Sequence, residues 1–303
     1  MSESAIKKVL VVGATGNVGK STLKALSEDG FQVTGLSRQV PSESALGDVK
    51  LLQTDYSASS LLEAFRGQDA VVSAVSSTAP GSLELQKSLI DVAIAAGVRI
   101  FVPSEFGMDT SVRSAPNFIP FLAEKIAVLD YLKERQDKIS WIAVVTGAMF
   151  DWGSKIPVFL GWNVNARTAT IYDGGDISYD ATNLDQVGRA IAKSLKKPEL
   201  TKNQYVYVNS FTVTQNEILR ALEKVTGEKF TISQGTVEDL WQGGAAQLKE
   251  GKPLGVLGML AGTVYGKGRI SNFSATQVLW NVNIGSAQEN LDESLRSLIS
   301  GGK

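Results

Sequence analysis

The chain has 303 residues, of which 43% are hydrophobic and 20% charged, enough for one large α/β domain or two small ones around a hydrophobic core. It has no histidine and no cysteine, which excludes hydrolysis through a histidine base, zinc sites of the Cys/His type, disulfides and thiol redox chemistry. With 30 basic and 31 acidic residues the net charge is -1, and no basic block occurs, so we expect no nucleic-acid partner.

The first half of the chain alternates short β-branched runs with amphipathic segments, which is the pattern of stacked βαβ units. We therefore predict an α/β fold in which residues 1–152 form a Rossmann-type, doubly wound parallel sheet. The predicted strands are residues 8–12, 32–37, 50–53, 70–75, 100–103 and 141–146. The predicted helices are residues 18–28, 59–66, 82–96 and 120–135.

Beyond residue 152 the alternation becomes irregular. The predicted elements are strands at residues 168–172 and 204–208, helices at 184–195 and 215–226, and a glycine-rich apolar stretch at 243–268. This stretch is a candidate lid. We expect residues 153–303 to form a smaller α+β substrate-binding region on the carboxyl edge of the sheet, with no flexible linker between the two parts.

A glycine-rich segment follows the first predicted strand, with three glycines at a spacing of three residues. Its candidate cofactor-binding residues are Gly13, Thr15, Gly16, Asn17, Val18 and Gly19. In a dinucleotide-binding loop the first glycine makes a tight turn, the second lets the backbone approach the pyrophosphate, and the third lets the helix pack on the strand. The N-terminus of the following helix supplies partial positive charge. The segment therefore predicts a dinucleotide site.

Residues 14–21 also match a relaxed phosphate loop of nucleoside triphosphatases, in which Lys20 binds phosphates and Ser21 binds magnesium. Such a site needs an aspartate at the end of a second hydrophobic strand, and the predicted strands end instead in serine or glycine. The dinucleotide interpretation is therefore favoured over this one and over a purely structural turn.

The end of the second predicted strand indicates which dinucleotide binds. NAD sites carry an acidic residue there that bonds the ribose 2′-hydroxyl, but this strand ends in Ser37 and Arg38. A planar guanidinium suits a 2′-phosphate, and the Ser37 hydroxyl can add a hydrogen bond. The sequence favours NADP(H), with an ordinary surface arginine as the alternative interpretation of Arg38.

A lysine lies within the apolar face of the predicted helix 120–135. At 100° per residue the face spans about 80° and consists of Leu122, Lys125, Leu129 and Leu132. Lys125 either extends along apolar surface to reach solvent or is desolvated, which lowers its pKa toward a range useful for proton transfer. The neighbouring Glu124 is expected to face solvent. Because the chain has neither histidine nor the Tyr-x-x-x-Lys pair of short-chain dehydrogenases, Lys125 is the candidate proton carrier.

Five features together resemble one family. They are the glycine segment, Leu36-Ser37-Arg38, Val72-Ser73-Ala74-Val75, Val102-Pro103-Ser104-Glu105-Phe106-Gly107 and Lys125. The chain resembles the isoflavone reductase and NmrA-like family of atypical short-chain dehydrogenases/reductases, and residues 146–152 and 172–175 resemble its fungal branch.

The resemblance implies an NADPH-dependent reductase that acts on a small aromatic or polyketide-like metabolite. It implies that Lys125 is catalytic, handling the proton beside the nicotinamide, which Phe106 would contact. The other implied cofactor-lining residues are Ser73, Ala74, Val75, Ser104 and Glu105. Plant members often carry a second basic residue after the arginine, but residues 39–43 have none. The family also includes regulators that sense NADP(H) without turnover, which is the alternative function.

Large apolar residues follow the sixth predicted strand, where its carboxyl end should face the nicotinamide. Together with Phe106, the candidate substrate-binding residues are Met149, Phe150, Trp152 and Trp162. Such side chains suit a flat apolar ligand, although core packing is the alternative for each of them.

No segment resembles a signal peptide or a membrane span, because residues 1–8 are polar and the longest apolar stretch, 254–265, is interrupted by glycines. We therefore expect a cytoplasmic protein, monomeric or homodimeric, with a small-molecule substrate and with no metal and no membrane partner.

Overall fold

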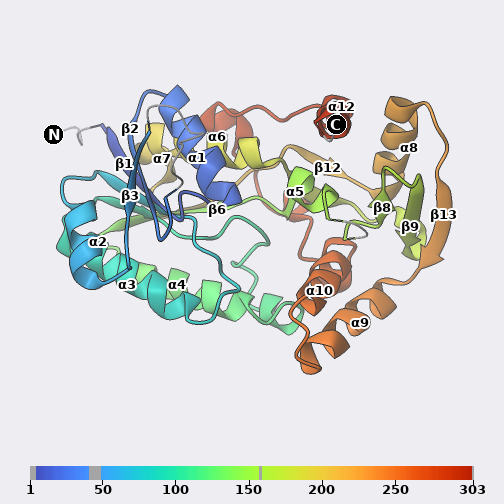
Figure 1. Cartoon of the computed structure of the whole chain (residues 1–303), viewed down its shortest axis with the longest axis horizontal. Coiled ribbons are helices and arrows are strands. Elements are labelled where there is room, and N and C mark those ends of the chain that lie inside the picture. Colours follow the sequence, from blue (N-terminus) through green and yellow to red (C-terminus); the bar gives the residue numbers. More distant parts are fainter. Residues whose placement is uncertain (1–4, 41–48, 157–158, 302–303) are drawn as a thin grey trace.

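A seven-stranded, entirely parallel sheet forms the centre of the molecule (Figure 1). The computed structural model describes residues 5–40, 49–156 and 159–301. The strand order is β3-β2-β1-β4-β5-β6-β11. The strands are β1 (Lys8–Val12), β2 (Gln32–Ser37), β3 (Lys50–Gln53), β4 (Ala70–Ser73), β5 (Ile100–Val102), β6 (Ser140–Val145) and β11 (Gln204–Tyr207). This order is that of the doubly wound dinucleotide-binding fold, which confirms the predicted fold class.

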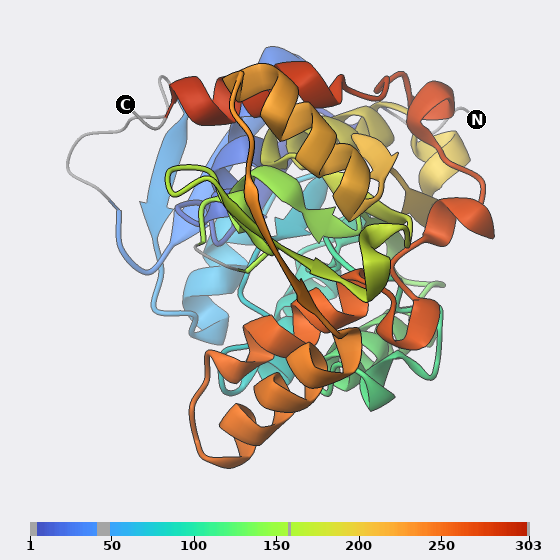
Figure 2. The same ribbon diagram turned by 90° about the vertical axis from the view of Figure 1, so that its right-hand side faces the viewer.

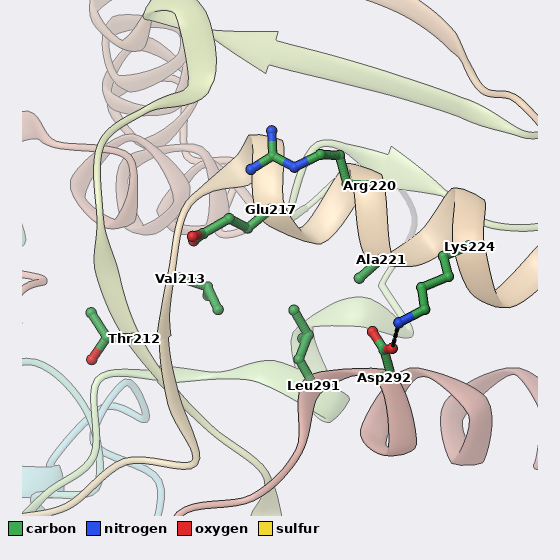
Figure 3. Close-up of a pocket in the computed structure, with 8 residues that line it drawn as sticks. All are labelled: Thr212, Val213, Glu217, Arg220, Ala221, Lys224, Leu291 and Asp292. Carbon is green, nitrogen blue, oxygen red and sulfur yellow. Dashed lines mark hydrogen bonds and ion pairs between the residues drawn. The ribbon is translucent and has the colours of Figure 1, made fainter.

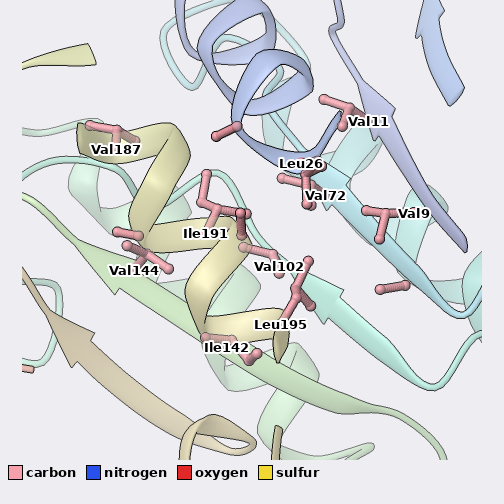
Figure 4. Packing of buried hydrophobic residues seen from close by; sticks show 14 of the residues in the cluster. Val9, Val11, Leu26, Val72, Val102, Ile142, Val144, Val187, Ile191 and Leu195 are labelled. Atoms are coloured by element: carbon pink, nitrogen blue, oxygen red, sulfur yellow. The ribbon is translucent and has the colours of Figure 1, made fainter. Parts of the chain in front are cut away.

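Helices cover both faces of the sheet, so its strands are buried and consist largely of valine, leucine and isoleucine. One face carries α1 (Asn17–Glu28) and α6 (Leu184–Lys196), and the other carries α2 (Ala58–Phe65), α3 (Ser82–Ala95) and α4 (Leu122–Lys133) (Figure 1). Figure 4 shows the first of these layers, in which strand residues such as Val72 and Val102 lie against Leu26 of α1 and Ile191 of α6.

The helices α1 and α6 approach each other closely at a glycine. A Cβ atom added to Gly188 would lie 2.3 Å from the backbone oxygen of Ser21, so only glycine permits this contact. Both α6 and β11 come from the chain beyond residue 152. The central sheet and its helical cover are therefore built from both of the parts into which the sequence was divided.

The remaining elements form two small sheets and the helices around them. One sheet has the order β12-β10-β7 and the other β13-β9-β8. Their strands are β7 (Ala148–Met149), β8 (Trp162–Asn163), β9 (Thr168–Tyr172), β10 (Tyr179–Thr182), β12 (Phe211–Val213) and β13 (Thr231–Gly235). The helices are α5 (Phe150–Ser154), α7 (Pro198–Thr201), α8 (Gln215–Thr226), α9 (Val237–Lys249), α10 (Gly255–Val264), α11 (Asn281–Ile284) and α12 (Leu291–Ser300). In Figure 2 the strands of this region lie between α8 and α12 above and α9 and α10 below.

Three predicted strands of the first half end one or two residues early in the structure, at Ser73, Val102 and Val145. The residues beyond β4 and β5 belong to loops, where the Ser104 hydroxyl donates a 2.8 Å hydrogen bond to the Val75 carbonyl. The predicted helix 120–135 begins at Leu122 instead of residue 120. Its preceding turns are closed by hydrogen bonds between residues three apart, which is the tighter 3₁₀ pattern.

The glycine-rich stretch 243–268 folds largely as helix, in the second half of α9 and in α10. Its glycines make the helix contact possible, because a Cβ on Gly244 would lie 2.5 Å from the Gly255 oxygen. The pair of helices α9 and α10 is also anchored to the rest of the molecule by Trp241, whose Nε1 donates a 2.9 Å hydrogen bond to the Phe118 carbonyl. No helix within the described ranges is long and apolar enough to span a membrane.

Candidate functional site

A cavity of about 400 Å³ opens at the carboxyl ends of β1, β4, β5 and β6. This is the edge where ligands bind in doubly wound folds, beside the point at which strand order reverses between β1 and β4. The cavity is lined by Gly16, Asn17, Val18, Ala74, Val75, Ser76, Ser77, Thr78, Ser104, Phe106, Gly107, Met108, Phe121, Leu122, Lys125, Gly147, Ala148, Met149, Trp152, Phe159, Leu260 and Val264.

The three glycines of the predicted dinucleotide loop have distinct geometric roles. Gly13 has a φ of +82°, and a Cβ there would lie 2.6 Å from the Ala74 oxygen, so glycine is required by both conformation and space. A Cβ on Gly19 would lie 2.2 Å from the Gly13 oxygen, which is the close approach of helix to loop expected of the third glycine. Gly16 is the N-cap of α1 and has no side-chain cap. The start of α1 therefore offers uncapped backbone N–H groups beside the cavity, a suitable site for phosphate.

The end of β2 lies beside this loop. The hydroxyl oxygens of Thr15 and Ser37 are 2.9 Å apart, so the loop and the strand end are joined by a hydrogen bond. Arg38 follows, with its guanidinium carbon 6.0 Å from the centre of the Tyr56 ring, and it lies outside the cavity lining. Of the segment 39–43, which lacks a second basic residue, positions 41–43 lie outside the described residues.

A buried glutamine joins the ends of β4 and β5. The side-chain oxygen of Gln86, a residue of α3 that is only 2% exposed, accepts hydrogen bonds from the Ser73 hydroxyl at 3.3 Å and from the Ser104 backbone N–H at 3.0 Å. Ser73 therefore lies behind the cavity and supports its wall, whereas Ala74 and Val75 line it. Sequence reasoning missed Gln86, whose only signal was a polar residue on the buried face of a predicted helix.

Lys125 is desolvated, which was one of the two situations allowed by its place in the apolar stripe. It is 7% exposed, lines the cavity, and donates a 2.5 Å hydrogen bond from Nζ to the backbone oxygen of Glu105. Burial lowers the pKa of Lys125, and the negative charge of Glu105 opposes this effect.

The side chains of Glu105 and Glu124 both lie in environments other than the predicted ones. The Glu105 side chain is 1% exposed and lies outside the cavity lining, where its carboxyl accepts a hydrogen bond from the Thr110 hydroxyl. Burial raises the pKa of Glu105 to about 7, against the opposing effects of Lys125 and Thr110. Glu124 is half-buried instead of solvent-facing, because it accepts a 2.5 Å hydrogen bond from the Ser82 hydroxyl.

The predicted substrate residues divide into two groups. Phe106, Met149 and Trp152 line the cavity, where the apolar wall is completed by residues that the sequence did not single out: Phe121, Phe159, Leu260 and Val264. Phe150 and Trp162 are 1% and 5% exposed and belong to a core cluster outside the lining. The Phe150 ring packs edge-on against Phe211 of β12, at 4.9 Å between centres, and lies 6.1 Å from the Trp162 ring. Phe150 and Trp162 are therefore part of the core.

A second depression lies between α8 and the start of α12 (Figure 3). Its wall includes an ion pair between Lys224 and Asp292 at 2.5 Å, and it contains none of the predicted site residues. Within residues 5–40, 49–156 and 159–301, no group of three or more acidic side chains is arranged to hold a metal ion.

Known proteins resemble this chain over most of its length. The sequence profile of the NmrA-like family matches residues 5–250. Oxidoreductase aprR of Aspergillus flavus is 33% identical over 299 residues, which cover 97% of this chain and 99% of that protein. The isoflavone reductase homolog IRL of Zea mays is 28% identical over 243 residues, covering 74% and 75% of the two chains.

Among solved structures, that of AtPrR2 with NADP+ and (+)pinoresinol superposes with a TM-score of 0.76 and covers 98% of this chain and 99% of its own. At 23% sequence identity this likeness shows the shared fold. The match of the family profile to most of the chain, together with the full-length relative, shows that the chain belongs to the NmrA-like family and is an oxidoreductase of its isoflavone reductase-like branch.

Proposed function

We propose that the protein is an NADPH-dependent reductase that transfers hydride from the nicotinamide to a small aromatic or polyketide-like metabolite, with Lys125 handling the proton. One observation carries this proposal. The buried Lys125 ammonium lines a cavity that has the start of the dinucleotide loop helix on one side and an apolar wall with several aromatic rings on the other. The structure of AtPrR2 with NADP+ and (+)pinoresinol supports both the choice of cofactor and the choice of a small aromatic substrate.

The cofactor supplies the hydride when bound, and the residues that would hold it fit its chemistry. The glycine loop and the uncapped start of α1 suit the pyrophosphate, because the backbone is accessible and the helix end is electropositive. Ser37 and Arg38 at the end of β2 suit the 2′-phosphate. Ala74, Val75, Ser104 and Phe106 line the part of the cavity that would take the nicotinamide.

Lys125 would provide the proton at its Nζ atom. The hydrogen bond to the Glu105 carbonyl fixes the end of an otherwise flexible side chain, which leaves its other protons for the cavity. Desolvation lowers the pKa and so makes proton release easier than from an exposed lysine. The apolar walls, among them Phe121 and Phe159, exclude water and suit a flat ring system.

The substitution Lys125→Met tests the role of the lysine, because methionine keeps most of the apolar stem and removes the proton carrier. We expect kcat to fall by about 100-fold or more, the usual contribution of a general acid, with the Kd for NADPH within a few-fold of wild type. Turnover is measured by NADPH oxidation with a panel of aromatic and polyketide-like ketones and enones.

Lys138→Met is the matched control, since Lys138 is exposed just beyond α4. It should retain wild-type turnover. Wild-type turnover in Lys125→Met would refute the catalytic role. Tight NADPH binding by the wild-type protein without turnover of any panel compound would instead favour the NADP(H)-sensing regulator.

A further inference from the structure

Glu105 lies in the loop between β5 and α4, yet the proposed mechanism uses only its backbone oxygen. Its neighbours Ser104 and Phe106 line the cavity, whereas the Glu105 carboxyl lies outside the lining. The backbone turns tightly here, because the N–H of Glu105 bonds the carbonyl of Pro103, two residues earlier, at 2.8 Å. The Glu105 carbonyl can therefore bond Lys125 while the side chain lies elsewhere.

The surroundings of the Glu105 carboxyl contain charges of both signs. Thr110 donates a hydrogen bond to it, and the charges of Lys125 and Lys133, both on α4, favour its ionised form. Asp109 disfavours that form, and its own carboxylate accepts a 3.3 Å hydrogen bond from Tyr207 of β11. Burial raises the pKa of Tyr205 of β11 to about 12, and the negative charge of Glu105 adds to this effect.

The side chains of Glu105 and Lys125, which are of opposite charge when ionised, are thus both buried, and a hydrogen bond from the Lys125 ammonium to the Glu105 backbone holds the two residues together. An isolated charge in such a place costs several kcal/mol, and it is retained only where an opposite charge or hydrogen bonds compensate it. Lys125 donates its hydrogen bond to the carbonyl of Glu105 and leaves the carboxyl to Thr110. The ammonium is therefore compensated electrostatically while its side chain stays at the cavity.

We propose that Glu105 is a positioning residue that sets the charge of Lys125: its carboxylate is the buried counter-charge that keeps the Lys125 ammonium protonated at the cavity wall. The relevance of this charge to turnover rests on the proposed function, but the pairing does not. Without the counter-charge, desolvation acts on Lys125 unopposed, so the lysine loses its proton at a lower pH.

The test is a pH titration of the full-length protein, with lysine labelled by ¹³C at Cε and followed by NMR. Lys125→Met identifies the Lys125 resonance. In Glu105→Gln, which keeps an acceptor for the Thr110 hydroxyl, we expect the Lys125 midpoint to fall by about one pH unit or more, a tenfold loss of proton affinity. An unchanged or higher midpoint would overturn the proposal.

Glu124→Gln is the matched control. Glu124 is adjacent to Lys125 in sequence, but its carboxyl bonds Ser82 and has no resolved effect on the pKa of Lys125. Its removal should leave the Lys125 midpoint in place. Thr110→Val provides a second variant if Glu105→Gln does not fold. It keeps the carboxyl but destabilises its ionised form, so the midpoint should fall in the same direction and by less, and an unmoved midpoint would count against the pairing.

Measurements of turnover distinguish a failure of the Glu105–Lys125 pairing from a failure of the proposed function. In Glu105→Gln the high-pH limb of kcat/KM should move to lower pH with the NMR midpoint, while the Kd for NADPH stays unchanged. If the midpoint moves but Lys125→Met still turns over substrate, the pairing holds and the catalytic role fails. If Lys125→Met is inactive and the midpoint does not move, the pairing alone fails.

Discussion

Lys125 violates a local pattern at the position to which we assign proton transfer. Burying a lysine among leucines costs solvation free energy that a fourth leucine or a methionine at this position would not cost. The sequence identified the position but left two outcomes open, because helical spacing fixes the direction of a side chain and not the environment around it. The loop that covers Lys125 comes from β5, some twenty residues earlier, and that contact is not visible in the helix itself.

Arg38 is the side chain to which we assign the preference for a 2′-phosphorylated dinucleotide. We expect Arg38→Ala to raise the Kd for NADPH by about 10-fold or more and to leave the Kd for NADH almost unchanged, because only the former carries a 2′-phosphate for the guanidinium. Fluorescence titration with both dinucleotides measures this.

Arg66→Ala is the control for a general loss of positive charge, since Arg66 is an exposed arginine at the C-terminal end of α2. It should bind both dinucleotides as wild type does. An unchanged preference for NADPH in Arg38→Ala would remove the assignment of the 2′-phosphate to this side chain.

At the scale of elements, the contact between the glycine loop and α1 is the most sensitive to added atoms. In Gly19→Ala the new methyl would lie 2.2 Å from the Gly13 oxygen, so the loop or the helix must move. We expect the protein to lose stability by about 1–3 kcal/mol and NADPH affinity by at least tenfold. Thermal unfolding and NADPH titration measure the two effects.

Gly243→Ala is the opposite case. Gly243 lies within α9, and a Cβ there would meet nothing within 4 Å. Alanine should stabilise the helix by up to about 1 kcal/mol through backbone entropy. If Gly19→Ala and Gly243→Ala behaved alike, the steric account of the loop would be wrong.

The elements of the first half were predicted well because strands such as β1 and β6 are apolar runs rich in valine, and helices such as α1 have a clear apolar face. The structure of residues 243–268 was harder to predict, because the sequence does not distinguish a glycine at a contact between two helices from a glycine in a flexible loop. Spacing could not show that Gly244 lies against Gly255. Gln86 was missed for a similar reason. Its side chain joins the ends of two strands, and only the folded sheet brings those ends together.

At the scale of the whole molecule, Glu105 makes stability depend on pH. Its pKa is about 7 when folded, against an ordinary value of 4.5, so the folded state binds the proton more tightly than the unfolded state. As pH rises from 4.5 to 7 the unfolded chain releases this proton and the folded protein retains it, which lowers the free energy of unfolding.

The free energy of unfolding of wild type minus that of Glu105→Gln should decrease steadily as pH rises from 4.5 to 7, because glutamine does not titrate. Urea unfolding at several pH values measures this difference. A difference that is constant or increases with pH would contradict the raised pKa.

The late position of β11 in the chain has a consequence for biosynthesis. β6 pairs with β5 on one side and β11 on the other, and β11 begins at Gln204, almost sixty residues after β6 ends at Val145. While a ribosome is still making those residues, the nascent sheet has a long apolar edge and an uncovered face where α6 will lie, both hazards for aggregation. We therefore expect the seven-stranded sheet to be completed only after more than two thirds of the chain has been translated.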